Sequence, residues 1–323
     1  MRTGTFLAAL AATCLVAAPP AFAQATWPAR PIRAVVPFAA GAATDTVART
    51  VLERMAKQLG QPIVVDNRPG AGGTIGSAMV AHAEPDGYTI LVHSNSHTVT
   101  QATYKNLNYS PSRDFIGVMP LASVPMVVVT SPARGAKTLQ DLVRIAKSAP
   151  GSMNYASAGA GGATHLGAER LRIAAGYQAT HIPFKGSAEA LTEVIAGRLD
   201  YYFSPIGLAL PHVQANRLIA LAVSSSRRSS AMASVPTTVE AGFPNSAYDV
   251  WIGMFAPVKT PRAIVNRLNE EAVKAIRSPE VKERFAGLVM DEMIMSVDEF
   301  AEFLAQDFQV NADLVKAAGV QPN

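Results

Sequence analysis

The first third of the chain alternates short apolar runs with amphipathic segments. Residues 32–38 are apolar and rich in β-branched side chains, which predicts a strand. Residues 46–59 repeat apolar side chains on one helix face, with Thr44 or Asp45 placed to cap the helix and Gly60 to end it. A strand, a helix and a strand are expected next, at residues 63–66, 74–83 and 88–93. This order is a βαβαβ unit, which is typical of a parallel, doubly wound sheet.

The same alternation begins again around residues 123–125. An apolar strand at 126–130 precedes a helix whose first residues, Thr138 to Asp141, resemble a capping box. Further strands are expected at 154–156, 180–183, 201–203 and 218–223, and helices end at Ala174 and Ala196, the second capped by Ser187. The middle of the chain is therefore a second α/β unit.

The last quarter of the chain changes character. Residues 248–256 form an apolar run, and residues 261–318 are almost wholly helical, with Pro261 and Pro279 at first helical positions. Because these helices need a surface to cover, we expect the chain to return to its first unit near Asp249. The predicted α/β fold has two lobes joined by two crossings, with a cleft between them. Lobe 1 comprises residues 24–124 and 248–323, and lobe 2 comprises residues 125–247.

Two short stretches, one in each predicted lobe, nearly repeat each other. They are residues 37–45 and 157–165. Aligned on Gly41 and Gly161, their last five residues read G-A-A-T-D and G-G-A-T-H. Each follows a strand-like run and opens a helix-like run. A turn of small residues at a helix N-terminus presents unpaired N–H groups to an anion. Such glycines also serve tight packing alone, but two similar loops favour a small carboxylate or other anion gripped between the lobes.

The candidate ligand-binding residues come mainly from these two loops. The first loop contributes Phe38, Ala39, Ala40, Gly41, Ala42, Thr44 and Asp45, and the second contributes Ser157, Ala158, Gly159, Gly161, Gly162, Ala163, Thr164 and His165. Ser94, Lys185 and Ser204 complete the set. Lys185 either meets the anion or is a solvated turn lysine, and Trp251 either lines the cleft or packs in an interlobe core.

Other chemistries find less support in the residues. Ser157, His165 and Asp45 are the right types for a hydrolytic triad, but no G-x-S-x-G motif occurs. His93 and His97 are four residues apart, yet they fall at a strand end and loop, and no H-E-x-x-H motif occurs. The glycine-rich turns match no nucleotide-binding motif. We therefore expect a protein without catalysis, metal or cofactor.

The N-terminus resembles an export signal. Arg2 precedes an apolar segment at 6–18, and residues 21–23 form an A-x-A site that predicts cleavage after Ala23 and a periplasmic protein. Cys14, the one cysteine among 323 residues, is a poor match to a lipid-attachment site, so the mature chain lacks disulfides. The basic residues behind the net charge of +4 are scattered, which argues against nucleic acid as a partner. We also expect the protein to be a monomer.

Blocks along the whole mature chain resemble one family. They are residues 27–32, 36–38 with Gly41, Asp45 and Arg49, then 59–62, 65–73, 85–89, 155–159 with Gly161, 165–166, 183–186 and 251–257. In this order they are similar to the Bug, or TctC-type, substrate-binding proteins of tripartite tricarboxylate transporters.

The resemblance implies a type II periplasmic binding protein fold that closes on a small carboxylate: a di- or tricarboxylate, an aromatic acid or an amino acid. It further implies that backbone amides and hydroxyls of residues 38–45 and 157–165 hold the carboxylate, with little help from charged side chains. The implied partners are the membrane subunits of a tripartite transporter. A sensor partner, or an enzyme on the same fold, are the alternatives. The family commonly has P-F-P-x-G-G in the first loop, where this chain has Ala39 and Ala42, so the resemblance does not identify the acid.

Overall fold

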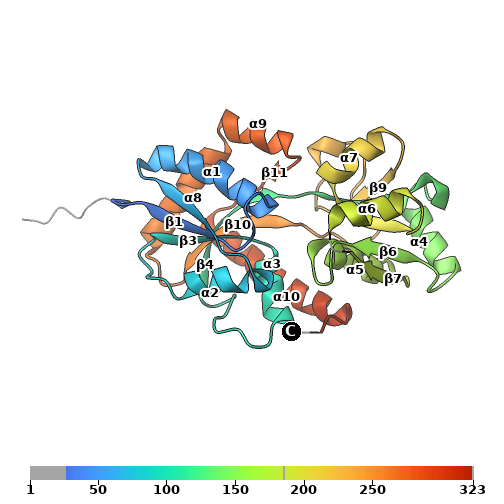
Figure 1. Ribbon diagram of the computed structural model, residues 1–323, viewed down its shortest axis with the longest axis horizontal. Helices are drawn as coiled ribbons and strands as arrows, with labels where there is room; N and C mark the ends of the chain where they lie inside the picture. The colour runs from blue at the N-terminus through green and yellow to red at the C-terminus, as the bar shows by residue number, and fades with distance from the viewer. Residues whose placement is uncertain (1–26, 185, 322–323) are drawn as a thin grey trace, which may run out of the picture.

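The protein consists of two bodies, each built on one β-sheet (Figure 1). The computed structural model describes residues 27–184 and 186–321. The first sheet has the strand order β11-β4-β10-β3-β1-β2, and the second has the order β7-β6-β8-β5-β9. The first sheet contains β1 (Ile32–Val36), β2 (Ile63–Asn67), β3 (Thr89–Ser94), β4 (Phe115–Ser123), β10 (Trp251–Pro257) and β11 (Asp291–Glu292). The second contains β5 (Met126–Thr130), β6 (Asn154–Ser157), β7 (Thr180–Pro183), β8 (Tyr201–Pro205) and β9 (Ile219–Val223).

Helices cover both sheets (Figure 1). Those of the first body are α1 (Ala43–Leu59), α2 (Thr74–Ala81), α3 (Ser96–Thr103), α8 (Arg262–Ile276), α9 (Pro279–Gly287) and α10 (Val297–Ala317). Those of the second are α4 (Leu139–Ser148), α5 (Ala163–Ala175), α6 (Ser187–Ile195) and α7 (Ile206–Gln214). None of the helices within the described residues has the length and apolarity to cross a bilayer.

The predicted two-lobed α/β fold is confirmed, but the first sheet is mixed rather than purely parallel. β1, β2 and β3 are parallel, as the βαβαβ pattern predicts. β10 then inserts antiparallel between β3 and β4. The residue pattern does not predict β4, because its nine residues are nearly all buried and lack the alternation that marks a half-exposed strand. The chain crosses to the second sheet after β4 and returns before β10.

Two predicted helix N-caps and one predicted first helical position are wrong, whereas Gly60 at the end of α1, the capping box of α4 and Pro279 at the first position of α9 are confirmed. Thr138 and Asp141 form the expected capping box of α4. Ala42, not Thr44 or Asp45, is the N-cap of α1, and its methyl side chain cannot cap the helix. The carboxylate of Asp45 instead turns back to the loop and accepts the Gly41 N–H. Two further caps are offset by one residue: Gly186 is the N-cap of α6 in place of Ser187, and Pro261 is the N-cap of α8 rather than its first residue.

Helix α10 is anchored in both bodies. Near its start, Phe300 and Leu304 pack with Trp251, which is fully buried in an aromatic cluster of the first body. Near its end, Leu314 and Val315 join the core of the second body, where they belong to the same cluster as Leu166. The helix therefore ties the bodies together in addition to the two crossings. The boundaries at residues 124–125 and 247–248 stay a prediction.

A half-buried carboxylate lies where α10 meets the returning strand. One oxygen of Asp307 accepts hydrogen bonds from the Thr98 hydroxyl at 2.6 Å, the Asn311 amide at 3.0 Å and the Trp251 indole at 3.3 Å. Burial nevertheless raises the pKa of Asp307 to about 6. Loss of hydration therefore outweighs three donors, and the charge is a cost to the folded state at neutral pH.

We expect Asp307→Asn to stabilise the protein at neutral pH. Because the folded carboxyl has the raised pKa, the folded state binds the extra proton between about pH 4 and 6, and stability falls as pH rises through that range. A shift of about two units corresponds to roughly 3 kcal/mol. Asparagine keeps an acceptor for Thr98 without the charge. Calorimetric unfolding at pH 4.5, 6 and 7.5 should show a higher Tm for the variant only at the upper values. A lower Tm at pH 7.5 would contradict this account.

Candidate functional site

Both repeated loops lie at the sheet edges from which the chain crosses. In the first sheet, Ser94 at the end of β3 pairs with Ile252 beside the returning crossing, and β1 runs parallel to β3. In the second, Pro205 at the end of β8 pairs with Met126 just after the outgoing crossing, and β6 runs parallel to β8. The loops after β1 and β6 therefore end up on the same side as the crossings, where ligands of open α/β sheets bind.

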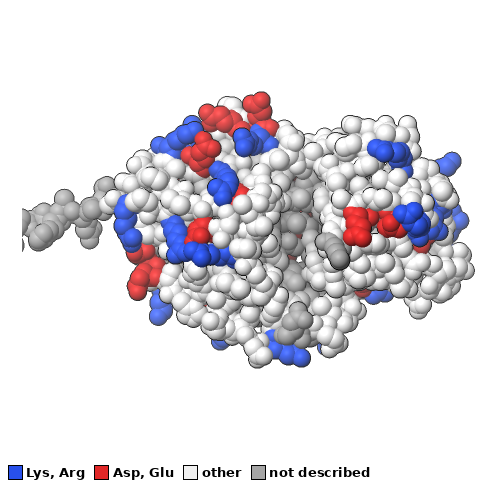
Figure 2. Space-filling view, in the orientation of Figure 1, with Lys and Arg blue, Asp and Glu red and all other residues white. Residues whose placement is uncertain are grey.

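A groove separates the two bodies on the face shown in Figure 2. Its walls are mostly uncharged in this view, and the Lys, Arg, Asp and Glu side chains gather on the outer surfaces. Ser94 and Ser204 also lie at strand ends on this side. Their hydroxyls contact nearby groups: Ser94 Oγ lies 2.8 Å from Ser96 Oγ, and Ser204 Oγ donates to the Pro205 carbonyl at 3.1 Å.

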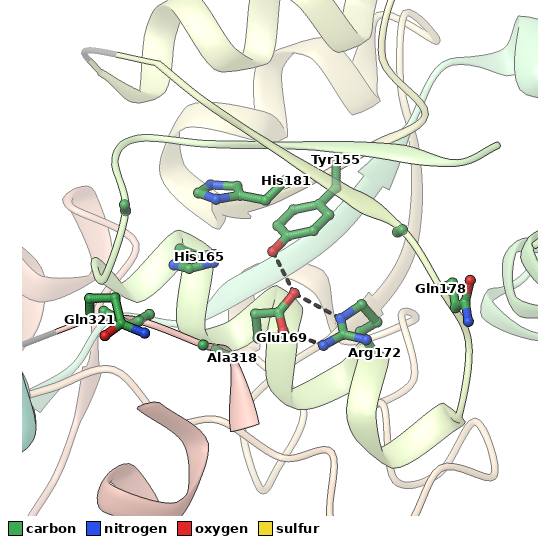
Figure 3. Close-up of a pocket in the computed structure, with 12 residues that line it drawn as sticks. Tyr155, His165, Glu169, Arg172, Gln178, His181, Ala318 and Gln321 are labelled. Carbon is green, nitrogen blue, oxygen red and sulfur yellow. Dashed lines mark hydrogen bonds and ion pairs between the residues drawn. The ribbon is translucent and has the colours of Figure 1, made fainter. Parts of the chain in front are cut away.

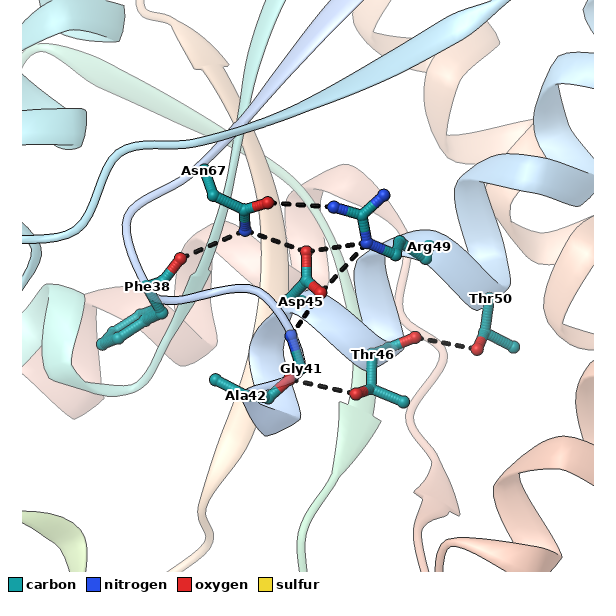
Figure 4. A network of polar contacts seen from close by, with 8 residues as sticks. All are labelled: Phe38, Gly41, Ala42, Asp45, Thr46, Arg49, Thr50 and Asn67. Atoms are coloured by element: carbon teal, nitrogen blue, oxygen red, sulfur yellow. Dashed lines mark hydrogen bonds and ion pairs between the residues drawn. The ribbon is translucent and has the colours of Figure 1, made fainter.

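In the first loop, one buried carboxylate organises the turn (Figure 4). Asp45 is 2% exposed and accepts the Gly41 N–H at 2.8 Å, the Arg49 Nε–H at 3.0 Å and the Asn67 amide at 2.9 Å. Asn67 also donates to the carbonyl of Phe38 at 3.1 Å and accepts from Arg49 at 2.9 Å. We call Asp45, Arg49 and Asn67 the loop-1 clamp, because they connect both ends of the turn to α1 and β2.

In the second loop, a histidine takes the place of the aspartate. The Gly161 N–H donates to His165 Nδ1 at 2.9 Å, which matches the Gly41 N–H donating to Asp45. Thr164 accepts the Ala158 N–H at 2.9 Å, and Ser157 Oγ accepts the Gly159 N–H at 3.1 Å. The near-repeat in sequence is thus a repeat in hydrogen bonding, in which the fifth residue holds the turn glycine.

These internal bonds decide which amides face a ligand. The turn glycines Gly41 and Gly161 are already paired, so the first turns of the helices carry the open donors. Within the described part of the chain, no group accepts from the N–H of Ala43, Thr44 or Asp45 in α1, or of Ala163 or Thr164 in α5. Five N–H groups thus remain at two helix N-termini, where the helix dipole favours negative charge.

Each fifth-position side chain is held in one charge state. Burial opposes ionisation of Asp45, but hydrogen bonds from Arg49, Gly41 and Asn67 outweigh it and lower its pKa. Burial and, to a smaller degree, the adjacent His181 together lower the pKa of His165 to about 4. Asp45 is therefore an anion balanced by Arg49, and His165 is neutral at physiological pH.

Within each loop, the structure brings the predicted residues together through the hydrogen bonds above, and their contact with a ligand stays a prediction. Ser204 is fully buried. Ser157 is fully buried, and its Oγ contacts His181 and the Gly159 amide inside the loop. Lys185 and the predicted export signal lie outside the described residues. Sequence reasoning missed Arg49, Asn67 and His181 as parts of the site. The i,i+4 spacing of Asp45 and Arg49 is the one local signal among them.

The comparisons define first a class and then a family. The fold is that of two-lobed periplasmic binding proteins: a chain described as "Structure of a periplasmic transporter" has a TM-score of 0.74 at 36% identity, covering 91% of this chain and 99% of its own. The chain belongs to the TctC family, the tripartite tricarboxylate transporter family receptors, whose model matches residues 47–320. A relative from Pseudomonas sp. strain P51, the UPF0065 protein in the tcbD-tcbE intergenic region, is 37% identical over 298 residues and covers 89% of both chains.

Two solved structures of this kind differ in ligand state. MatC from Rhodopseudomonas palustris with bound malate has a TM-score of 0.71 at 32% identity and covers 90% of this chain and 100% of its own. A TctC solute-binding protein from Polaromonas without ligand has a TM-score of 0.82 at 26% identity and covers 90% of this chain and 99% of its own. The shape of this protein is therefore closer to the ligand-free relative, despite the lower identity.

Proposed function

We propose that this protein is a periplasmic receptor that captures a small organic acid and delivers it to the membrane subunits of a tripartite transporter, without catalysing a reaction. The observation that carries the proposal is the pair of matching loops, each presenting unpaired N–H groups at a helix N-terminus on the crossing side of its sheet. Membership of the TctC receptor family supports the ligand class and the partner. The malate in MatC is an acid of this class.

The ligand carboxylate would be held by backbone donors from both bodies. The N–H groups of Ala43 and Thr44 point from α1, and those of Ala163 and Thr164 point from α5. Hydrogen bonds between such amides and a charged acceptor each contribute about 1.5–3 kcal/mol. Two helix dipoles add favourable potential without a basic side chain in either loop. The negative charge of Asp45 does not repel the ligand strongly, because Arg49 lies 3.0 Å from it.

Ligand capture would close the groove. Each body contributes only part of the donor set, so a ligand that contacts both sets binds the closed arrangement more tightly than the open one. The groove between the two bodies in Figure 2 supports an open state for the unliganded chain. Two crossings and α10 are the connections about which the bodies would rotate.

A ligand screen tests the proposal. We expect thermal-shift assays with malate, adipate, tricarboxylates, aromatic acids and amino acids to raise the Tm for one acid class, and calorimetry to give its Kd. The neutral diamide of the same acid should not bind, because the site is built for a charged acceptor. Small-angle scattering should show a more compact particle with the acid than without it. Equal binding of acid and diamide, or an unchanged profile with a bound acid, would contradict the proposal.

A further inference from the structure

The strongest unexplained feature near the site is a pair of stacked histidines behind the second loop (Figure 3). The rings of His165 and His181 lie 3.8 Å apart with planes inclined by 10°, and the Tyr155 ring lies beside both, 5.0 Å from His181 and 6.2 Å from His165. They line a cavity of about 760 Å³ whose opposite wall is formed by the C-terminal residues 318–321.

We propose that His165 and His181 are positioning residues that hold the second loop in its ligand-ready form, and that His165 acts through the Gly161 amide rather than by touching the ligand. This inference rests on the proposed function, since it assigns how the same site is kept in shape. His165 Nδ1 accepts the Gly161 N–H, so its proton is on Nε2. The acceptor nitrogen is therefore committed to the loop.

The second ring holds the other end of the loop. His181 Nε2 contacts Ser157 Oγ, and the same oxygen accepts the Gly159 N–H at 3.1 Å. Strand β7 thus fixes the first residues of the loop through His181, while α5 fixes its glycine turn through His165. The stack joins the two supports into one unit, which spans the whole loop from Ser157 to His165.

The surroundings keep His165 in the form that can accept. Burial and the neighbouring imidazole disfavour its protonation, with a pKa of about 4. The nearby carboxylate of Glu169 would favour it, but Arg172 binds that carboxylate at 2.6 and 2.8 Å, and the Tyr155 hydroxyl donates to it. In a protonated His165, Nδ1 carries a proton and cannot accept the Gly161 N–H, so the hydrogen bond that holds the turn would be lost. The Glu169–Arg172 pair therefore protects the neutral ring.

Three variants separate positioning from contact and from packing. His165→Phe keeps an aromatic ring in the stack but removes the acceptor, and we expect it to weaken binding of malate or adipate about tenfold. His165→Asn supplies a side-chain oxygen that can accept the Gly161 N–H, as the Asp45 carboxylate accepts the Gly41 N–H in the first loop. This variant should therefore recover most of the affinity that His165→Phe loses. His181→Phe keeps the stack and removes the contact with Ser157, so it should also weaken binding.

If His165 contacted the ligand through Nε2, both variants at position 165 would lose affinity equally. If only packing mattered, phenylalanine would bind as well as histidine. Either result would overturn the proposal.

A spectroscopic measurement tests the hydrogen bond without any ligand. The nitrogen-15 NMR spectrum of the ligand-free protein should show His165 neutral, with its proton on Nε2 and an acceptor shift at Nδ1, from pH 8 to pH 5.5. A proton on Nδ1 in that range would refute the arrangement. Because this readout needs no acid, a failure of the proposed function, seen as no binding of any acid by the unaltered protein, is distinguishable from a failure of this inference.

Discussion

Ala43→Pro and Ala163→Pro are each expected to weaken acid binding roughly 10- to 150-fold while leaving the fold intact. Both residues occupy the first position of their helices, and no described group accepts from their N–H. Proline is well tolerated at this position, because its missing N–H is not needed by the helix. The preceding residues Ala42 and Gly162 have extended backbones with ψ of 160° and 170°, as proline requires of its neighbour. Each change therefore deletes one ligand donor worth about 1.5–3 kcal/mol.

The matched controls are Ala43→Val and Ala163→Val, which add bulk of similar size but keep the N–H. We expect the valine variants to bind within a few-fold of the unaltered protein, with Kd measured by calorimetry and folding checked by circular dichroism. The chain itself shows that proline fits, since Pro279 occupies the equivalent position in α9. Full affinity in both proline variants would show that the amides of α1 and α5 do not hold the acid.

The near-repeat of the two loops was the most informative sequence signal, because its physical basis is local. A turn of small residues between a strand and a helix leaves N–H groups open wherever it occurs, so the loops and their likeness could be predicted from Gly41 and Gly161 alone. The sequence does not predict which of these amides stay without a hydrogen-bond acceptor. The side chains of Asp45 and His165 fold back four residues to take the glycine N–H groups, and that choice depends on partners from other elements.

Those partners are distant in sequence, which explains what sequence reasoning missed. Asn67 reaches the first loop from the end of β2, and His181 reaches the second from β7. Their roles follow from strand pairing, because β2 lies beside β1 and β7 beside β6. β4 was not predicted for a related reason: its burial comes from α10 and α8 and from the paired strand β10, none of which is near it in the chain. The local pattern of apolar residues therefore predicts most helices and strands. It does not predict contacts made, or strands buried, by elements that are distant in the sequence.

Removal of the buried carboxylate in the first loop should abolish most of the binding and also destabilise the protein. Asp45→Ala leaves the Gly41 N–H and the Asn67 amide without their acceptor, and Arg49 without its counter-ion. Hydrogen bonds to a charged group contribute about 1.5–3 kcal/mol each, and partial replacement by water leaves roughly 2–4 kcal/mol of stability lost. A loop that no longer holds its turn presents the α1 amides poorly, so we expect at least a hundredfold weaker binding.

The dependence on pH and a matched control make this prediction specific to the clamp. The pKa of Asp45 is lowered on folding, so its stabilisation is present above the unfolded value of about 4 and is lost as pH falls through the lower folded value. The stability difference between Asp45→Ala and the unaltered protein should therefore be constant from pH 8 to 5 and vanish in stronger acid. Arg49→Ala, which removes a side chain that is 52% exposed, should cost less than about 1 kcal/mol. Asp45 favours binding by holding the loop, and electrostatic repulsion between Asp45 and the ligand's carboxylate acts against binding. If Asp45→Ala binds the acid more tightly, that repulsion outweighs positioning and the clamp model is wrong.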